Sequence, residues 1–311
     1  MFATIALLAA LQGAAPALAQ EPAAPVATEA AAAAAESHAA SEEFDILHHL
    51  QNSREIETPV GTIHLPAKGS WMVGPLDLTP TKHVVFLWLT ALVLLAIFLP
   101  GARAAKRSRA EGRSPKGGHN ALEAMVLFLR DQVIMPNVGK GGEGYVPFVA
   151  TLFFFILIAN LLGILPWGAT ATGNLSVTAA LAIISLVVIE LAGMKTLGAK
   201  GYLGTIVFVP QGLPKPLVPV MALIMTPVEL LGKLTKPFAL AIRLFANMTA
   251  GHVLLLAIIS LIFVFGSLAV AVAPVLMAVA ITFLELFVAA LQAYIFALLT
   301  SVFIGLIRTA H

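Results

Sequence analysis

Residues 240–252 read LAIRLFANMTAGH, which places an arginine, an asparagine and a histidine inside an apolar run that extends from Phe238 to Phe265. A bilayer crossing needs about 20 apolar residues, so this run is long enough to span a membrane. Ionisable groups at such depth cost about 2.5–3.5 kcal/mol on insertion scales and are functional candidates by default. The stretch therefore predicts a membrane-spanning helix that carries a functional site.

The composition of the whole chain agrees with a membrane protein. Of its 311 residues, 59% are hydrophobic and 11% are charged, against about 25% charged residues in an ordinary soluble domain. A soluble globular enzyme is therefore excluded. Because the chain has no cysteine, disulfides, cysteine-based zinc sites and cysteine nucleophiles are excluded as well.

The order of apolar runs predicts an all-α polytopic membrane protein. Five runs are predicted to cross the bilayer: His83–Leu99, Val146–Leu165, Leu175–Leu191, Phe238–Phe265 and Val275–Ile307. Ala121–Met135 has apolar residues on one side and charged residues on the other, and is predicted to be an interfacial amphipathic helix. Pro216–Leu231 is predicted to lie in or re-enter the membrane without spanning it, because a sixth crossing would invert the distribution of positive charge.

The basic residues predict the orientation. Residues 1–82 hold 3 basic and 9 acidic residues, a balance of −6, and residues 83–311 hold 15 basic and 7 acidic residues, a balance of +8. The basic residues are scattered over loops between apolar runs, which indicates membrane topology and not a nucleic-acid surface. With five crossings, the N-terminus lies outside, the C-terminus inside, and all 15 basic residues after position 82 lie on or near the inner side.

The N-terminal part predicts three regions with boundaries at residues 19 and 82. Residues 1–19 form a short apolar run that ends in Ala17-Leu18-Ala19, which predicts a signal peptide. Residues 20–82 form an extension, Ala-rich and partly disordered. Residues 83–311 form the membrane domain. The extension contains His48, His49 and His64, which we interpret as solvated, so that no metal and no cofactor are expected.

The last apolar run is longer than a bilayer requires. Val275–Ile307 has 33 residues and extends about 50 Å as a helix, against a hydrocarbon core of about 30 Å. A straight helix of this length needs a tilt of roughly 50°, which is beyond the usual 0–40°. The run therefore predicts a large protein partner alongside.

Helical geometry sorts the polar residues into faces. At 100° per residue, Asn247 lies about 40° from Arg243, whereas His252 points about 180° away. Glu285 and Gln292 are seven positions apart and share one face of the last helix. Glu229 precedes Arg243 by 14 positions and shares its face within about 40° if the helix is continuous, but the segment Lys233–Pro237 favours a bend.

The chemistry of these residues indicates a gated proton path. Histidine, and glutamate whose pKa burial has raised, relay protons near neutral pH. Arginine stays charged and does not relay protons, so that it holds a carboxylate ionised and blocks a continuous proton wire. Simpler interpretations remain open: an arginine that snorkels to the surface, and a packed histidine or a buried acid bonded to a neighbouring helix. A secondary proton-coupled transporter is the alternative function, although no internal repeat is found.

Several stretches resemble subunit a of F-type ATP synthases. Residues 240–252 resemble the arginine helix of that family, and Glu285 with LQAYIF at 291–296 resembles its final helix. The stretches GNLSVT at 173–178 and PNVG at 136–139 are similar to earlier parts of the same family. The resemblance covers roughly residues 83–311.

The resemblance implies a non-catalytic, proton-translocating stator subunit in a bacterial inner membrane. It implies that Arg243 faces the carboxylates of a rotating c-subunit ring, between two offset half-channels. Asn247, His252, Glu285 and Gln292 match the outward half-channel, and Glu229 matches the inward one. In some relatives the acid precedes the histidine, so we carry His252 and Glu285 over as a pair. Expected partners are the c-ring, b-type peripheral stalk subunits, the rest of the F1Fo complex and membrane lipid. No Gly-x-x-x-x-Gly-Lys-Ser/Thr loop is present, so ATP chemistry belongs to other subunits.

Overall fold

The structure is a computed structural model. It describes residues 55–58, 61–66, 70, 72–73, 76–77, 79–112, 117–165, 168, 170–206, 218–265 and 268–309. The chain divides into two units, Met1–Asp45 and Ile46–His311, and every described residue belongs to the second unit. The predicted signal peptide, the Ala-rich tract at 20–40, and His48 and His49 lie outside the described residues.

Two short antiparallel hairpins precede the first long helix. β1 (Glu55–Thr58) pairs with β2 (Gly61–His64), and β3 (Met72–Val73) pairs with β4 (Leu76–Asp77). The sequence analysis predicted no strand here, because runs of two to four residues are too short to show a period-2 pattern. His64 lies opposite Glu55 in the ladder of the first hairpin.

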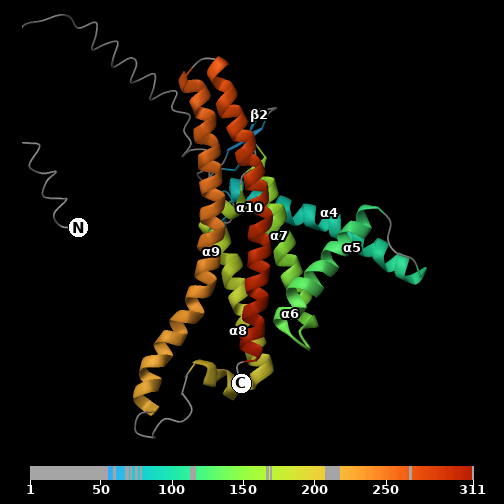
Figure 1. Cartoon of the computed structure of the whole chain (residues 1–311), viewed down its shortest axis with the longest axis vertical. Helices are drawn as coiled ribbons and strands as arrows, with labels where there is room; N and C mark the ends of the chain where they lie inside the picture. The colour runs from blue at the N-terminus through green and yellow to red at the C-terminus, as the bar shows by residue number, and fades with distance from the viewer. Residues whose placement is uncertain are drawn as a thin grey trace, which may run out of the picture. The chain divides into compact units, whose positions relative to one another are not determined.

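Five helices of the described part are long and apolar enough to cross a membrane, which confirms the predicted number and order of crossings. Figure 1 shows α7, α8, α9 and α10 as long helices that run alongside one another, and the contacts between these helices agree. Their bounds are α4 (Lys82–Ala110), α7 (Val146–Ile164), α8 (Leu175–Ile206), α9 (Val218–Phe265) and α10 (Leu268–Arg308).

The first helix continues beyond its predicted end. α4 passes through Pro100 and reaches Ala110, whereas the sequence analysis ended it at Leu99. A proline removes one backbone hydrogen bond and strains one turn, but the residues that follow are mostly alanine, arginine and lysine, which are strong helix formers. The helix therefore resumes after the proline.

The segment Pro216–Leu231 and the arginine helix, predicted as separate, form a single helix. α9 has 48 residues and contains Pro227 and Pro237. Contacts hold the charged middle of α9: the ammonium nitrogen of Lys233 lies 3.4 Å from a carboxylate oxygen of Glu190, and that of Lys236 lies 5.2 Å from the ring centre of Phe303. Figure 1 shows α9 bending in its first half, as internal prolines commonly cause.

The predicted amphipathic segment is helical but irregular. It consists of α5 (Gly118–Phe128), a π-helical stretch η1 (Leu129–Ile134) and α6 (Met135–Val138). Leu129 and Val133 are buried, whereas Arg130 and Asp131 are exposed, which agrees with the predicted division into two sides over the π-helical stretch. In α5 no residue is buried. The π-helical stretch adds a residue per turn and has no signature in the sequence pattern.

The core surrounds α7. α10 packs directly against α7, whereas α9 packs against α8 and α10. In the span that contains α7, 56% of the most apolar 18-residue stretch is buried. The corresponding fraction is only 6% in α9 and 11% in α10. Two 3₁₀ turns, η2 (Glu143–Tyr145) and η3 (Ala171–Gly173), flank α7. With 41 residues, α10 extends about 60 Å, so the great length predicted for this helix is confirmed.

Candidate functional site

A histidine and a carboxylate meet between α9 and α10. Nδ1 of His252 lies 3.8 Å from Oε1 of Glu285, and the Glu285 residue is only 8% exposed. The other carboxylate oxygen of Glu285 is buried and has no hydrogen-bond partner among the described residues. Gly251 makes the approach possible, because any β-carbon at this position would collide with the Glu285 carboxylate.

Nine residues earlier on α9, about two and a half helical turns away, an amide links the same two helices. Gln292 is 3% exposed, and its Nε2 donates a 2.8 Å hydrogen bond to the backbone carbonyl oxygen of Arg243. On the other side of α10, Asn160 of α7 donates a 3.3 Å hydrogen bond to the carbonyl oxygen of Ala289 and accepts a 2.6 Å hydrogen bond from Thr172. These bonds set the axial register of α10 against α7 and α9.

The side chains of Arg243 and Asn247 lie on the exposed side of α9. This agrees with the predicted separation between their face and the face of His252, which points towards α10. Among the described residues, no carboxylate lies within 4.0 Å of the Arg243 guanidinium. The structure therefore presents a fixed positive charge on an apolar helix face that no other part of the described chain covers.

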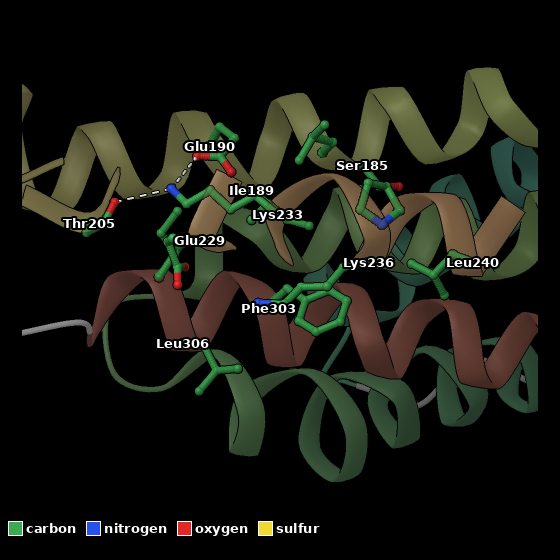
Figure 2. A pocket seen from close by; sticks show the side chains of 13 residues that line it. Ser185, Ile189, Glu190, Thr205, Glu229, Lys233, Lys236, Leu240, Phe303 and Leu306 are labelled. Carbon is green, nitrogen blue, oxygen red and sulfur yellow. Dashed lines mark hydrogen bonds and ion pairs between the residues drawn. The ribbon is translucent and has the colours of Figure 1, made fainter. Parts of the chain in front are cut away.

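Glu229 lies in a different place, in a cavity of about 140 Å³ between α8, α9 and α10. Figure 2 shows Lys233 of α9 reaching Glu190 and Thr205 of α8, whereas Glu229 and Lys236 of α9 point towards the helix α10 that carries Phe303 and Leu306. Glu229 and Arg243 are 14 residues apart, or about 21 Å along a helix. The cavity and the His252–Glu285 pair are therefore separate sites on the same helix.

A hydrogen-bonded ion pair closes one side of this cavity. Lys233 donates a 3.4 Å hydrogen bond to Glu190 and a 3.2 Å hydrogen bond to the hydroxyl of Thr205. The hydroxyl of Tyr202, beyond the apolar span of α8, donates a 2.6 Å hydrogen bond to the same carboxylate oxygen. Burial, followed by this carboxylate, raises the pKa of Tyr202 to about 12, so the phenol remains a neutral donor at physiological pH.

Some of these residues were absent from the predicted site. Glu190 was not assigned to the predicted site, and its pairing with Lys233 joins positions 43 apart in the chain. Asn160 was not assigned to it either, and the carbonyl that accepts its hydrogen bond lies 129 positions away. Helical spacing identifies faces within one helix, and it contains no information on pairing between helices.

Fold and site together define a polytopic helical membrane protein that carries ionisable side chains inside its apolar spans. The family model described as ATP synthase A chain matches residues 84–305. A protein named ATP synthase subunit a 2 from Chlorobaculum tepidum is 45% identical over 93% of this chain and 80% of its own length. ATP synthase subunit a from Myxococcus xanthus is 49% identical over 76% of this chain and 75% of its own length.

The chain belongs to the ATP synthase A chain family. It has the role of that family, the proton-channel stator subunit in the membrane sector of an F-type ATP synthase. Membership decides against the transporter alternative and places the chain, as a multi-pass membrane protein, in the F1Fo complex.

Proposed function

We propose that protons pass this subunit through two separate half-channels, and that Arg243 keeps the two apart. The observation that carries the proposal is the exposed Arg243 side chain on α9, with no carboxylate within 4.0 Å in the described part of the chain. An unpaired charge on an apolar membrane face costs about 2.5–3.5 kcal/mol. A ring of c subunits, each with one carboxylate, supplies the missing partner.

The outward half-channel runs along His252, Glu285, Gln292 and Asn247. The contact between His252 and Glu285 supports this assignment, because two titratable groups 3.8 Å apart need only a small shift of one side chain to reach hydrogen-bond distance for a direct proton transfer. The free oxygen of Glu285 adds an acceptor at the same place. Gln292 holds the arginine turn of α9 against α10 and so sets the distance between the pair and Arg243.

The inward half-channel begins at the cavity around Glu229. Support comes from its lining, which combines Glu229 and Glu190 with the ammonium groups of Lys233 and Lys236. Basic side chains at this end of the three helices also agree with a cytoplasmic side: Lys195 of α8, Lys233 and Lys236 of α9, and Arg308 of α10. The C-terminus then lies in the cytoplasm and the N-terminus in the periplasm of a bacterial inner membrane.

The coupling follows from the charges. A ring carboxylate is neutral while it faces lipid, because an ionised carboxylate there is costly. Near Arg243 the ionised form is favoured, so the proton leaves by one half-channel and a new proton enters from the other. A proton that crosses 100 mV supplies about 2.3 kcal/mol. The offset between the two access paths converts this free energy into rotation of the ring, and b-type stalk subunits hold the stator still.

Replacing Arg243 tests the proposal. We expect Arg243→Ala to abolish ATP-driven proton pumping by the reconstituted complex, measured with a pH-sensitive dye, while the ATPase activity of the detached catalytic head is unchanged, because this subunit carries no ATP chemistry. Lys140→Ala removes an exposed positive charge outside the apolar spans and serves as the matched control. Coupled pumping by Arg243→Ala at the level of the control would refute the role of Arg243.

A further inference from the structure

A second cavity, of about 430 Å³, lies where the apolar spans of α8 and α10 end and the span that contains α7 begins. Its polar side is formed by Lys195, Thr196 and Arg308, and its apolar side by Val188, Leu191 and Ala192 of α8. It shares no lining residue with the cavity around Glu229. The proton path proposed above therefore makes no use of it.

The positive charges in this cavity are not neutralised. Arg308 donates hydrogen bonds to the backbone carbonyls of Val138 (2.7 Å) and Lys140 (3.0 Å), which are uncharged acceptors. Its Nε is buried and has no partner among the described residues. Within the same residues, no carboxylate lies within 4.0 Å of Lys195 or Arg308. Glu143, on the adjoining turn, is exposed and has no ion pair there.

The walls of the cavity place it at the boundary between hydrocarbon and headgroups. Lys195 and Arg308 lie within a few residues of the ends of their apolar spans, and Tyr145 lies near the start of the span that contains α7. Tyrosine, arginine and lysine favour this depth. From the cavity an exposed apolar strip follows α8 into the membrane through Leu191, Val187 and Ile184, which are 53%, 49% and 49% exposed.

We propose that this cavity binds the phosphodiester headgroup of an anionic phospholipid. Arg308 and Lys195 neutralise the phosphate, and Thr196 offers a hydroxyl beside it. The acyl chains follow the apolar strip of α8. Inorganic phosphate has the same charge chemistry but leaves the apolar wall unused, so we assign the site to lipid. Basic pockets between helices at a membrane surface commonly bind lipid headgroups in this way.

Protection of Lys195 tests the assignment in the assembled complex. The complex is reconstituted into vesicles of phosphatidylcholine, with or without phosphatidylglycerol, and labelled with an amine-reactive reagent before mass spectrometry. We expect phosphatidylglycerol to reduce labelling of Lys195 several-fold and to leave Lys140 unchanged, because Lys140 is exposed and does not line the cavity. Equal labelling of Lys195 in both vesicles would overturn the proposal. Equal protection by inorganic phosphate in pure phosphatidylcholine would also overturn it, in favour of a free anion.

A pair of matched variants supplies a second measurement. Binding of spin-labelled phosphatidylglycerol, read from its motionally restricted fraction, is compared between Lys195→Gln and Lys140→Gln. We expect Lys195→Gln to weaken binding about fivefold, as the loss of one lysine near an anionic headgroup does, and Lys140→Gln to have no effect. Equal affinity in both variants would contradict the proposal. If Lys195→Gln does not assemble, the labelling of the unaltered complex decides.

Discussion

At the scale of residues, the contact between Glu285 and His252 is the central feature of the site. Glu285 has one oxygen 3.8 Å from His252 and a second, buried oxygen without a hydrogen-bond partner among the described residues. A buried polar atom of this kind calls for an explanation, and a proton or water molecule in transit provides one. At this scale His252 and Glu285 act as a pair, because each is the other's nearest titratable contact.

Exchange of the two side chains tests the pair. We expect His252→Leu or Glu285→Leu to reduce ATP-driven proton pumping by roughly tenfold or more, equivalent to about 1.4 kcal/mol in a rate barrier. The double variant His252→Glu with Glu285→His restores both kinds of group at the same contact, and we expect it to recover part of the rate. Pumping in the exchanged variant that is no better than the product of the two single losses would count against a paired role.

At the scale of elements, the site depends on how closely α9 approaches α10. Gly251 of α9 faces the Glu285 carboxylate, and Ala289 and Ala293 of α10 are fully buried. Small residues allow membrane helices to approach closely, and the bond between Gln292 and the Arg243 carbonyl depends on that approach. A larger side chain at Gly251 would therefore displace Glu285 and weaken the contact between α9 and α10.

Two glycines of α9 provide a matched comparison of this packing. A β-carbon at Gly251 would overlap the Glu285 side chain, whereas one at Gly232 meets nothing within 4 Å. We expect Gly251→Ala to destabilise the subunit by about 1–3 kcal/mol through overpacking and to lower pumping. We expect Gly232→Ala to stabilise α9 slightly, by up to about 1 kcal/mol. The measurements are unfolding of the purified subunit in mixed detergent and pumping of the complex. Similar effects of both substitutions would show that Gly251 and the Glu285 side chain are not tightly packed.

At the scale of the whole molecule, the uncovered side of α9 and α10 indicates a large partner. Only 6% and 11% of their most apolar residues are buried, against 56% in the span with α7. Lipid covers an apolar face, but it does not offer a carboxylate to Arg243. The proposed ring of acid-bearing helices would cover the apolar face and supply the carboxylate.

Because the chain has no cysteine, a single introduced cysteine is unique within the subunit. We expect a photoreactive label on Ala246→Cys, which is exposed beside Arg243, to cross-link the small ring subunit of the assembled complex. Leu92→Cys on α4 is the control, because this position is 64% exposed and lies on a different helix. Capture of the ring subunit from Leu92 but not from Ala246 would place the ring on the wrong side for the proposed function.

The amino-acid sequence by itself determined the class of protein, the number of crossings and the grouping of polar residues into faces. The number of crossings follows from the lengths of the apolar runs, because the hydrocarbon core of the bilayer has a nearly constant thickness. The 100° helical step places Asn247 beside Arg243 and His252 opposite because it is local geometry. The sequence analysis was wrong about the effect of two prolines. Pro100 and Pro237 lie within continuous helices, because neighbouring turns and contacts compensate for the hydrogen bond that each proline removes.

Only the tertiary structure decided which residues meet across helices. The partners of Lys233, Gln292 and Asn160 are 43, 49 and 129 positions away, and no local period relates such positions. Both cavities also form between elements far apart in the chain: the first between α8, α9 and α10, and the second between α8, the end of α10 and the turn before α7. Register depends on packing summed over whole helix faces, so it becomes visible only when all the helices are in place.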